Sequence, residues 1–206
     1  MAQFFQIHPD NPQPRLIRQA VEILRGGGVI VYPTDSSYAL GCQVGHKEPL
    51  ERIRQIRRLD EKHNFTLVGR DLSEVSQYTK IDNAQYRLIK NLTPGPYTFI
   101  LKATKQVPRR LMNPKRKTIG IRIPDNRIAL ALAEELGEPI LSSTLILPGD
   151  EHPLADPWEI KEVLEHQVDL IIDGGYCGLE PTTVLVMEDD QVQVARRGKG
   201  DVSLFE

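Results

Sequence analysis

Hydroxyl and carboxylate side chains cluster just after an apolar run near the start of the chain. The run Val29–Val31 follows three glycines, and the residues Thr34–Tyr38 come directly after Pro33. A short β-branched run bounded by glycine and proline is typical of a buried strand. Loops at the ends of core strands carry the ligand sites of open α/β sheets. The stretch therefore predicts the floor of a pocket, and a turn that satisfies only its own backbone is the alternative.

Arginines and further hydroxyls stand at the ends of other predicted strands. Arg122 ends one apolar run, Arg196 and Arg197 end another, and Ser142–Thr144 end a third. A guanidinium group presents a fork of donors that matches phosphate oxygens. Hydroxyls and guanidiniums together predict a site for a phosphate and a small polar ligand.

Positive charge is concentrated in three clusters, although the net charge is only −2, from 26 Lys and Arg against 28 Asp and Glu. Such clusters on a near-neutral chain suit phosphate or RNA binding on one face. Each cluster is alternatively the solvated face of a helix. The clusters are Arg52, Arg54, Arg57, Arg58 and Lys62; Lys102, Lys105, Arg109, Arg110, Lys115, Arg116 and Lys117; and Arg196, Arg197 and Lys199.

Several kinds of chemistry are disfavoured by position or spacing. Gly26–Gly28 precede a predicted strand, whereas phosphate-binding glycine loops lie between a strand and a helix. Cys42 and Cys177 are far apart, and the five histidines show no metal spacing, so neither a disulfide nor a metal site is expected. Ser142–Thr144 have no base nearby in the sequence, which disfavours a serine hydrolase.

Helices and strands alternate along most of the chain, and a β-hairpin closes it. With 206 residues, no linker and no repeat, this order predicts one α/β domain with a mixed sheet and surrounding helices. Apolar periodicity and turn residues delimit the elements. The predicted strands are 4–7, 29–31, 65–68, 97–103, 118–123, 139–143, 170–173, 182–187 and 191–195. The predicted helices are 14–25, 50–59, 72–78, 82–92, 127–136 and 158–166.

The N-terminal segment has neither the basic region nor the apolar region of a signal peptide. No stretch approaches the roughly 18 apolar residues that a membrane span needs. We therefore expect a cytoplasmic protein without membrane partners. The sequence does not determine the oligomeric state, and a monomer is favoured.

Six short motifs lie in a specific order between about residues 14 and 200. In this order they resemble the YrdC-like superfamily, the threonylcarbamoyl-AMP synthase fold, and among its branches they look most similar to YciO. No single motif is decisive, but their joint order is specific. The segments that carry the resemblance are Gly28–Tyr38, Pro94–Leu101, Ile119–Pro124, Leu141–Thr144, Thr182–Val184 and Arg196–Gly198.

The resemblance implies a single YrdC-like domain over residues 14–200, with a twisted mixed sheet and a deep, positively charged cleft. In this family the cleft binds nucleotide and, in some members, double-stranded RNA or tRNA. Its synthases join threonine, bicarbonate and ATP into threonylcarbamoyl-AMP, which serves to modify adenosine 37 of tRNA. No tightly bound cofactor is implied, and ATP with Mg²⁺ as its counter-ion would be a substrate.

Site residues follow from the resemblance by position. Cations must neutralise charge at the α-phosphate and the departing pyrophosphate, and the resemblance gives this role to Arg58 and Lys62. Thr34 would contact an amino-acid-like ligand, and the turn Pro94–Thr98 would shape the cleft. The ligand-binding residues that the resemblance implies are Thr34, Thr98, Arg122, Ser143 and Arg196.

Three positions depart from the pattern of the synthases. The first lysine of K-x-R-x-x-x-K falls on Ile56, unless a shift lets Arg57 substitute for it. The asparagine of S-x-N falls on Leu145, and the histidine of P-L-x-x-H falls on Gly69. Losing one such contact to a transition state typically costs about 10²–10³ in rate.

Three hypotheses follow for the function. The first is a protein that binds nucleotide and double-stranded RNA or tRNA. It takes part in threonylcarbamoyl-adenosine chemistry but is a poor synthase of threonylcarbamoyl-AMP. The second is an active threonylcarbamoyl-AMP synthase in which Arg57 and Thr144 replace the missing groups. The third is a non-enzymatic protein whose basic clusters form an assembly surface beside a relict cleft.

Overall fold

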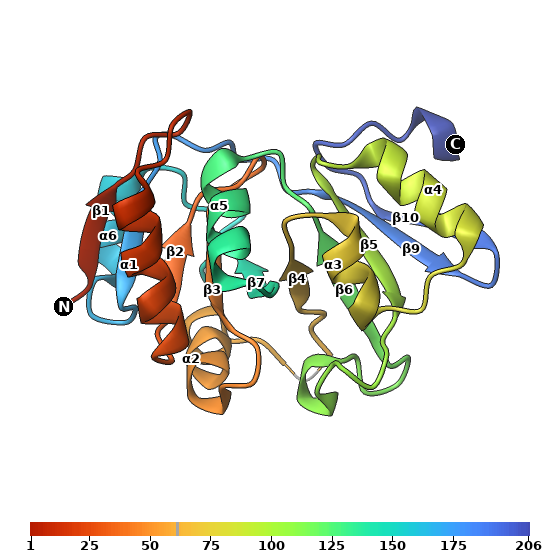
Figure 1. The fold of residues 1–206 in the computed structure, drawn as a ribbon, viewed down its shortest axis with the longest axis horizontal. Helices are drawn as coiled ribbons and strands as arrows, with labels where there is room; N and C mark the ends of the chain where they lie inside the picture. The colour runs from red at the N-terminus through yellow and green to blue at the C-terminus, as the bar shows by residue number, and fades with distance from the viewer. Residues whose placement is uncertain (61) are drawn as a thin grey trace.

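A continuous ten-stranded sheet runs through the molecule in the computed structural model, which describes residues 1–60 and 62–206 (Figure 1). The strands are β1 Gln3–Gln6, β2 Ile30–Tyr32, β3 Ala39–Gln43, β4 Thr66–Val68, β5 Tyr97–Lys102, β6 Thr118–Arg122, β7 Ile140–Thr144, β8 Leu170–Asp173, β9 Thr183–Glu188 and β10 Gln191–Arg196. The helices are α1 Pro14–Arg25, α2 Lys47–Arg57, α3 Leu72–Val75, α4 Asn83–Leu92, α5 Arg127–Leu136 and α6 Pro157–Leu164.

The strand order is β1-β8-β2-β3-β7-β4-β6-β5-β9-β10. The pairs β1–β8, β2–β8, β4–β6 and β5–β9 are parallel, and the other neighbours are antiparallel. The prediction of one mixed α/β domain is therefore confirmed. The antiparallel β7–β4 pair joins the half of the sheet that carries the N-terminus to the half that carries the C-terminus (Figure 1).

Helices cover both faces of the sheet at β2, so this strand is buried on both sides. In β2, Ile30 and Tyr32 belong to the same core as residues of α1 and α5, which lie in front of that half of the sheet in Figure 1. Val31 belongs instead to the core that includes Ile53 of α2 and Ile160 of α6. A strand buried on both faces reads as a continuous apolar run, which explains the sequence pattern that predicted it.

Most element boundaries follow from local sequence signals. Pro14 stands in the first turn of α1, and Gly26 follows its last residue. In α5 the side chain of Asn126 accepts a hydrogen bond from the N–H of Ala129, and Gly137 ends the helix in the left-handed conformation. None of the helices in the described part of the chain is long and apolar enough to cross a membrane.

One strand, β3, was not predicted. Its residues Ala39–Gln43 are mostly small, and such residues give a weak strand signal. A Cβ on Gly41 would lie 2.8 Å from Tyr32 Cε1 and 2.9 Å from Ile140 Cγ2, so this position accepts only glycine without a shift. Because β3 pairs antiparallel with β2, the segment Thr34–Tyr38 connects two adjacent strands. The prediction of a simple loop after β2 is corrected accordingly.

Candidate functional site

A cavity of about 250 Å³ opens where the two halves of the sheet meet, and we call it the cleft. It is bounded by β4, β5, β7, β9 and β10, by the end of α2 and by the segment before β4. A smaller cavity of about 30 Å³ adjoins it and shares several lining residues. The cleft is lined by Arg57, His63, Asn64, Thr66, Thr98, Ile100, Ser142, Ser143, Thr144, Ile146, Thr182, Val184 and Arg196.

Two arginines give the cleft its charge. Arg57, the last residue of α2, donates from Nη1 to Ser143 Oγ at 2.5 Å and from Nε to the carbonyl of Ile146 at 3.1 Å. Arg196 donates from Nε and Nη2 to the carbonyl of Thr182 at 3.0 and 2.8 Å. Among the described residues that line the cleft there is no Asp or Glu. Neutral oxygens are thus the only partners these two guanidiniums have in the cleft.

Burial and mutual repulsion both act on these arginines. Burial lowers the pKa of Arg57, and the charge of Arg196 lowers it further. Burial likewise lowers the pKa of Arg196, with a smaller contribution from Arg122. Two crowded cations without a counter-charge are stabilised when an anion binds between them. The electrostatics of the cleft therefore favour an anionic ligand.

A histidine also lines the cleft. His63 Nε2 lies 3.3 Å from Ser143 Oγ, and its ring packs edge-on against Phe65 with centroids 5.1 Å apart. Burial lowers the pKa of His63 to about 4, and the charges of Arg57 and Arg54 contribute. The imidazole is therefore neutral at pH 7. The sequence predicted only a lone surface histidine, because 80 residues separate His63 from Ser143.

Hydroxyl groups form the floor of the cleft. Thr98 Oγ1 and Thr182 Oγ1 are hydrogen-bonded at 2.8 Å, and both side chains are buried. Gly120 pairs with Thr66 across β4–β6 and therefore faces the same side of the sheet. A Cβ at this position would lie 2.9 Å from Thr66 Oγ1 and 3.2 Å from Thr98 Cγ2. The open space of the floor thus depends on glycine at this position.

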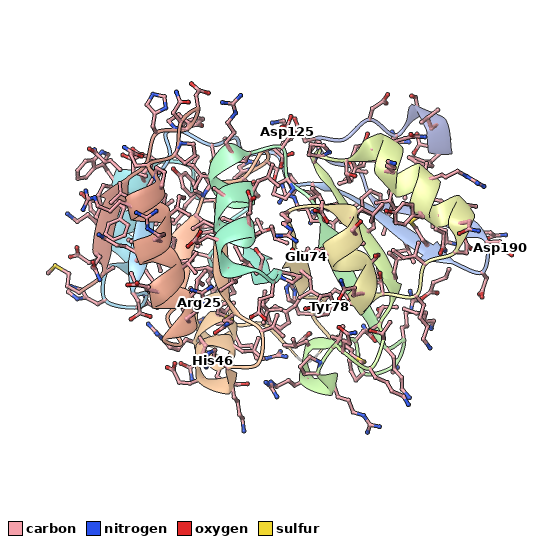
Figure 2. The ribbon with its side chains drawn as sticks, in the orientation of Figure 1. Arg25, His46, Glu74, Tyr78, Asp125 and Asp190 are labelled. Carbon is pink, nitrogen blue, oxygen red and sulfur yellow. The ribbon has the colours of Figure 1, made fainter. Side chains whose placement is uncertain are left out.

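Arg122 borders the smaller cavity, and its contacts are mainly with the chain itself. Its Nη2 donates to Thr34 Oγ1 at 3.2 Å and to Ser36 Oγ at 2.9 Å, and it forms an ion pair with Asp35. Asp35 Oδ2 also accepts the backbone N–H of Asp125 at 2.9 Å (labelled in Figure 2). Arg122 Nε is buried and has no hydrogen-bond partner in the described part of the chain.

Thr34 lies behind Arg122 and does not line either cavity. Its hydroxyl donates to the carbonyl of Ser37 at 2.5 Å and accepts the backbone N–H groups of Ser36 and Ser37. These are the contacts of a turn that satisfies its own backbone. Ser37 of the same turn does border the smaller cavity.

Some of the site residues that the resemblance implied line the cleft, and others do not. Thr98, Ser143 and Arg196 line the cleft together. Arg58, the residue that follows α2, does not: it has a φ of 53° and lines a separate hollow with Ile56. Lys62 is exposed and lines neither cavity. Their proposed contacts with phosphates remain predictions.

The three departures from the synthase pattern lie away from the open cleft. Ile56 and Leu145 are buried in the core. Gly69 has no room for a side chain, because a Cβ would lie 2.3 Å from Val75 Cγ1. Arg57 and Thr144, in contrast, both line the cleft.

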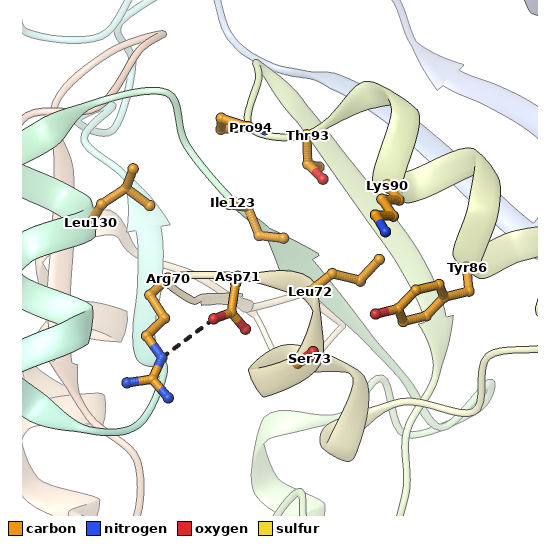
Figure 3. A pocket seen from close by; sticks show the side chains of 10 residues that line it. All are labelled: Arg70, Asp71, Leu72, Ser73, Tyr86, Lys90, Thr93, Pro94, Ile123 and Leu130. Atoms are coloured by element: carbon orange, nitrogen blue, oxygen red, sulfur yellow. Dashed lines mark ion pairs between the residues drawn. The ribbon is translucent and has the colours of Figure 1, made fainter.

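A second hollow of about 370 Å³ lies between α3 and α4 (Figure 3). Arg70 points toward Asp71 there, and its Nε lies 3.5 Å from a carboxylate oxygen of Asp71 and of Glu74. Two carboxylates therefore already pair with its guanidinium, whereas Arg57 and Arg196 in the cleft donate to neutral oxygens.

Two of the basic clusters join into one surface beside the cleft. Arg54 Nη2 donates to the carbonyl of Arg110 at 3.1 Å, and Asn113 Nδ2 lies 3.5 Å from the carbonyl of Lys62. These contacts hold the segment after α2 against residues 110–113. We call the exposed cations here the basic surface: Lys62, Lys105, Arg109, Arg110, Lys115, Arg116 and Lys117.

A family model described as "Telomere recombination" (Sua5_yciO_yrdC) matches residues 22–198. The chain belongs to the Sua5/YciO/YrdC family. The protein YciO of Escherichia coli strain K12 is 64% identical over 205 residues, which cover 100% of both chains. The crystal structure of E. coli YciO agrees with the fold at a TM-score of 0.97, also over 100% of both chains. The predicted resemblance to the YciO branch is confirmed.

More distant members of the family include synthases. A threonylcarbamoyl-AMP synthase of Coxiella burnetii is 30% identical over 159 residues, which cover 77% of this chain and 84% of that protein. The structure of P. abyssi Sua5 complexed with L-threonine has a TM-score of 0.86 at 24% identity. It covers 95% of this chain and 57% of that one, and it shows the shared fold. The relation to threonylcarbamoyl-AMP synthases is therefore established by sequence.

Proposed function

We propose that the chain binds a nucleotide or another phosphate-bearing ligand in the cleft, and tRNA or duplex RNA on the basic surface. It takes part in threonylcarbamoyl-adenosine chemistry as a poor synthase. It is a cytoplasmic monomer. One observation carries the proposal: Arg57 and Arg196 face a hydroxyl-lined cavity in which no described lining residue is acidic. ATP with Mg²⁺ as counter-ion is the nucleotide we expect to bind.

Poor synthesis is inferred from the number of cations that reach the cleft. Arg58 and Lys62, the two matches to the synthase signature, do not line it. Arg122 is neutralised by Asp35. Among the described residues that line the cleft, two guanidiniums are thus free to neutralise the α-phosphate and the departing pyrophosphate. Each missing contact to a transition state lowers the rate by about 10²–10³.

The nucleotide part is tested by calorimetry with MgATP and by a pyrophosphate-release assay with threonine and bicarbonate. We expect ATP to bind and threonine-dependent pyrophosphate release to be at least about 10²-fold slower than with the C. burnetii synthase as positive control. Failure of ATP to bind would overturn the nucleotide part of the proposal.

The RNA part is tested by filter binding of tRNA over a series of salt concentrations. Affinity should fall as salt rises, because phosphate contacts release counterions. Changing Lys115, Arg116 and Lys117 to Ala should make the plot of log affinity against log salt concentration less steep. Its slope should fall in magnitude by about 0.9 for each phosphate contact that is lost. The matched control changes Arg87 and Lys90 of α4 to Ala and should bind as the wild type does. Binding that is independent of salt would remove RNA from the proposal.

An active synthase is the second candidate, since Arg57 and Thr144 both line the cleft. They are the two residues that could replace the lysine and asparagine of the synthase pattern. Threonine-dependent pyrophosphate release at the rate of the control synthase, and its loss in Arg57→Ala, would favour this candidate over a poor synthase.

A further inference from the structure

Ser143 Oγ contacts both a cation and a base. Arg57 Nη1 is 2.5 Å from it, and His63 Nε2 is 3.3 Å from it. Arginine has no acceptor, so Ser143 Oγ accepts the bond from Arg57. Its own proton is then available to His63 Nε2, when the imidazole carries its proton on Nδ1.

These contacts are those of an activated serine. A hydroxyl is a weak nucleophile until an adjacent base removes its proton, and a distance slightly above 3.2 Å is common before a ligand binds. The guanidinium of Arg57 stabilises the negative charge that forms on Oγ. Ser143 is 5% exposed, and Phe65 packs against the His63 ring, so both partners are held in place.

The neutral state of His63 at pH 7 agrees with a role as proton acceptor. Arg57 and Arg54 of α2 disfavour its protonation, and Asp60 after α2 opposes them. A bound phosphate between Arg57 and Arg196 would add negative charge and raise the pKa of His63. The imidazole would therefore become a stronger base when the cleft is occupied.

We propose that Ser143 is a nucleophile and His63 its general base, and that the cleft hydrolyses acyl phosphates. The phosphate group lies between Arg57 and Arg196, which places the neighbouring carbonyl carbon near Ser143 Oγ. An acyl phosphate is the class that carries an electrophilic carbon next to a phosphate. This proposal rests on the proposed function only for phosphate binding in the cleft.

The reaction has two steps. In the first, the bond from Ser143 Oγ to the carbonyl carbon forms and the bond from that carbon to the phosphate oxygen breaks. The proton of the hydroxyl passes to His63 Nε2 and then to the departing phosphate. In the second, water attacks the acyl ester and gives its proton to His63, which returns a proton to Ser143 Oγ as the ester bond breaks. The products are a carboxylic acid and inorganic phosphate.

Acetyl phosphate is the probe, and released phosphate and the mass of the protein are the readouts. The wild-type protein should hydrolyse it above the buffer rate and carry an acetyl group on Ser143 in rapid-quench samples. Ser143→Ala should return to the buffer rate, and His63→Gln should be slower by about 10²-fold. The matched control, Ser76→Ala on the surface after α3, should behave as the wild type.

Two further measurements separate this proposal from a folding defect and from phosphate binding alone. Ser143→Cys retains a nucleophile and should accumulate an acetyl thioester at the same position. Urea unfolding of Ser143→Ala, followed by circular dichroism, should show a cooperative transition and so establish that this variant is folded. Equal hydrolysis by the wild type and Ser143→Ala would overturn the proposal, as would a phosphate instead of an acetyl group on Ser143. ATP binding without hydrolysis or adduct overturns it and leaves the proposed function standing.

Discussion

Arg122 and Arg57 lie at opposite ends of the same site, and their surroundings differ in one decisive respect. Arg122 is 7% exposed and pairs with a carboxylate, Asp35, besides two hydroxyls. Arg57 is only partly buried and donates to a hydroxyl and a carbonyl. A charge with an internal counter-charge is already compensated within the fold, whereas a charge without one is available to a ligand. The comparison predicts that the inner end of the site, at Arg122, is structural and that the outer end, at Arg57, binds the ligand.

The largest effect we expect is on stability, from Arg122→Ala. Removing one partner of a buried ion pair leaves Asp35 uncompensated and costs about 3–5 kcal/mol. Urea unfolding followed by circular dichroism measures this change. Replacing both partners, as Arg122→Met with Asp35→Leu, should recover much of the loss. A single variant as stable as the wild type would show that the pair contributes nothing.

The next effect concerns ligand affinity and contrasts two consecutive residues. Arg57→Ala should weaken MgATP binding by about 10- to 100-fold, because a hydrogen bond to a charged group contributes about 1.5–3 kcal/mol. Arg58→Ala is the matched control, since Arg58 faces a different hollow, and should stay within about twofold. Calorimetry measures both. Equal losses in the two variants would contradict the division of the site.

Most of the fold could be predicted from the sequence, because local sequence signals determine most of its elements. The predicted helix 127–136 matches α5, and the predicted strand 170–173 matches β8. The strand β3 escaped prediction because its glycine is required by close contacts with Tyr32 and Ile140, which come from elsewhere in the chain. Only the packed structure reveals such a requirement.

The site was less predictable, because its geometry depends on which way neighbouring side chains point. The resemblance named Thr98, Ser143 and Arg196, and these do lie together. It gave the phosphate contacts to Arg58 and offered Arg57 as a substitute for the lysine that falls on Ile56, yet Arg57 lines the cleft and Arg58 does not. His63 could not be linked to Ser143 by spacing, since the fold alone brings them together.

Gly120→Ala tests the comparison of Arg57 with Arg122, because it adds a methyl group to the floor of the cleft between the two ends of the site. The added methyl group would press on Thr66 and Thr98, at a cost of about 1–3 kcal/mol in the free energy of unfolding. It should also weaken MgATP binding by taking space from the cleft. Gly26→Ala is the control, because its Cβ would meet no atom closer than 3.4 Å. A variant that binds ATP with wild-type affinity would show that the ligand does not reach the floor.

The smallest effect is the pH dependence that His63 gives to stability. Its pKa is about 4 in the folded protein and near 6.5 in the unfolded chain, so the unfolded state binds more protons between these values. Stability that is present above pH 6.5 should therefore be lost as the pH falls toward 4. Between pH 7 and pH 5, the free energy of unfolding of the wild type should fall by about 1–2 kcal/mol more than that of His63→Gln. Urea unfolding measures both values.

Phosphate should reduce this loss in the wild type, because an anion beside Arg57 raises the pKa of His63 in the folded state and narrows the gap to the unfolded value. The inner end of the site should show no such response, since Arg122 already has its counter-charge in Asp35. If the wild type and His63→Gln respond to pH identically with and without phosphate, the outer end carries no unsatisfied charge, and the contrast between the two ends fails.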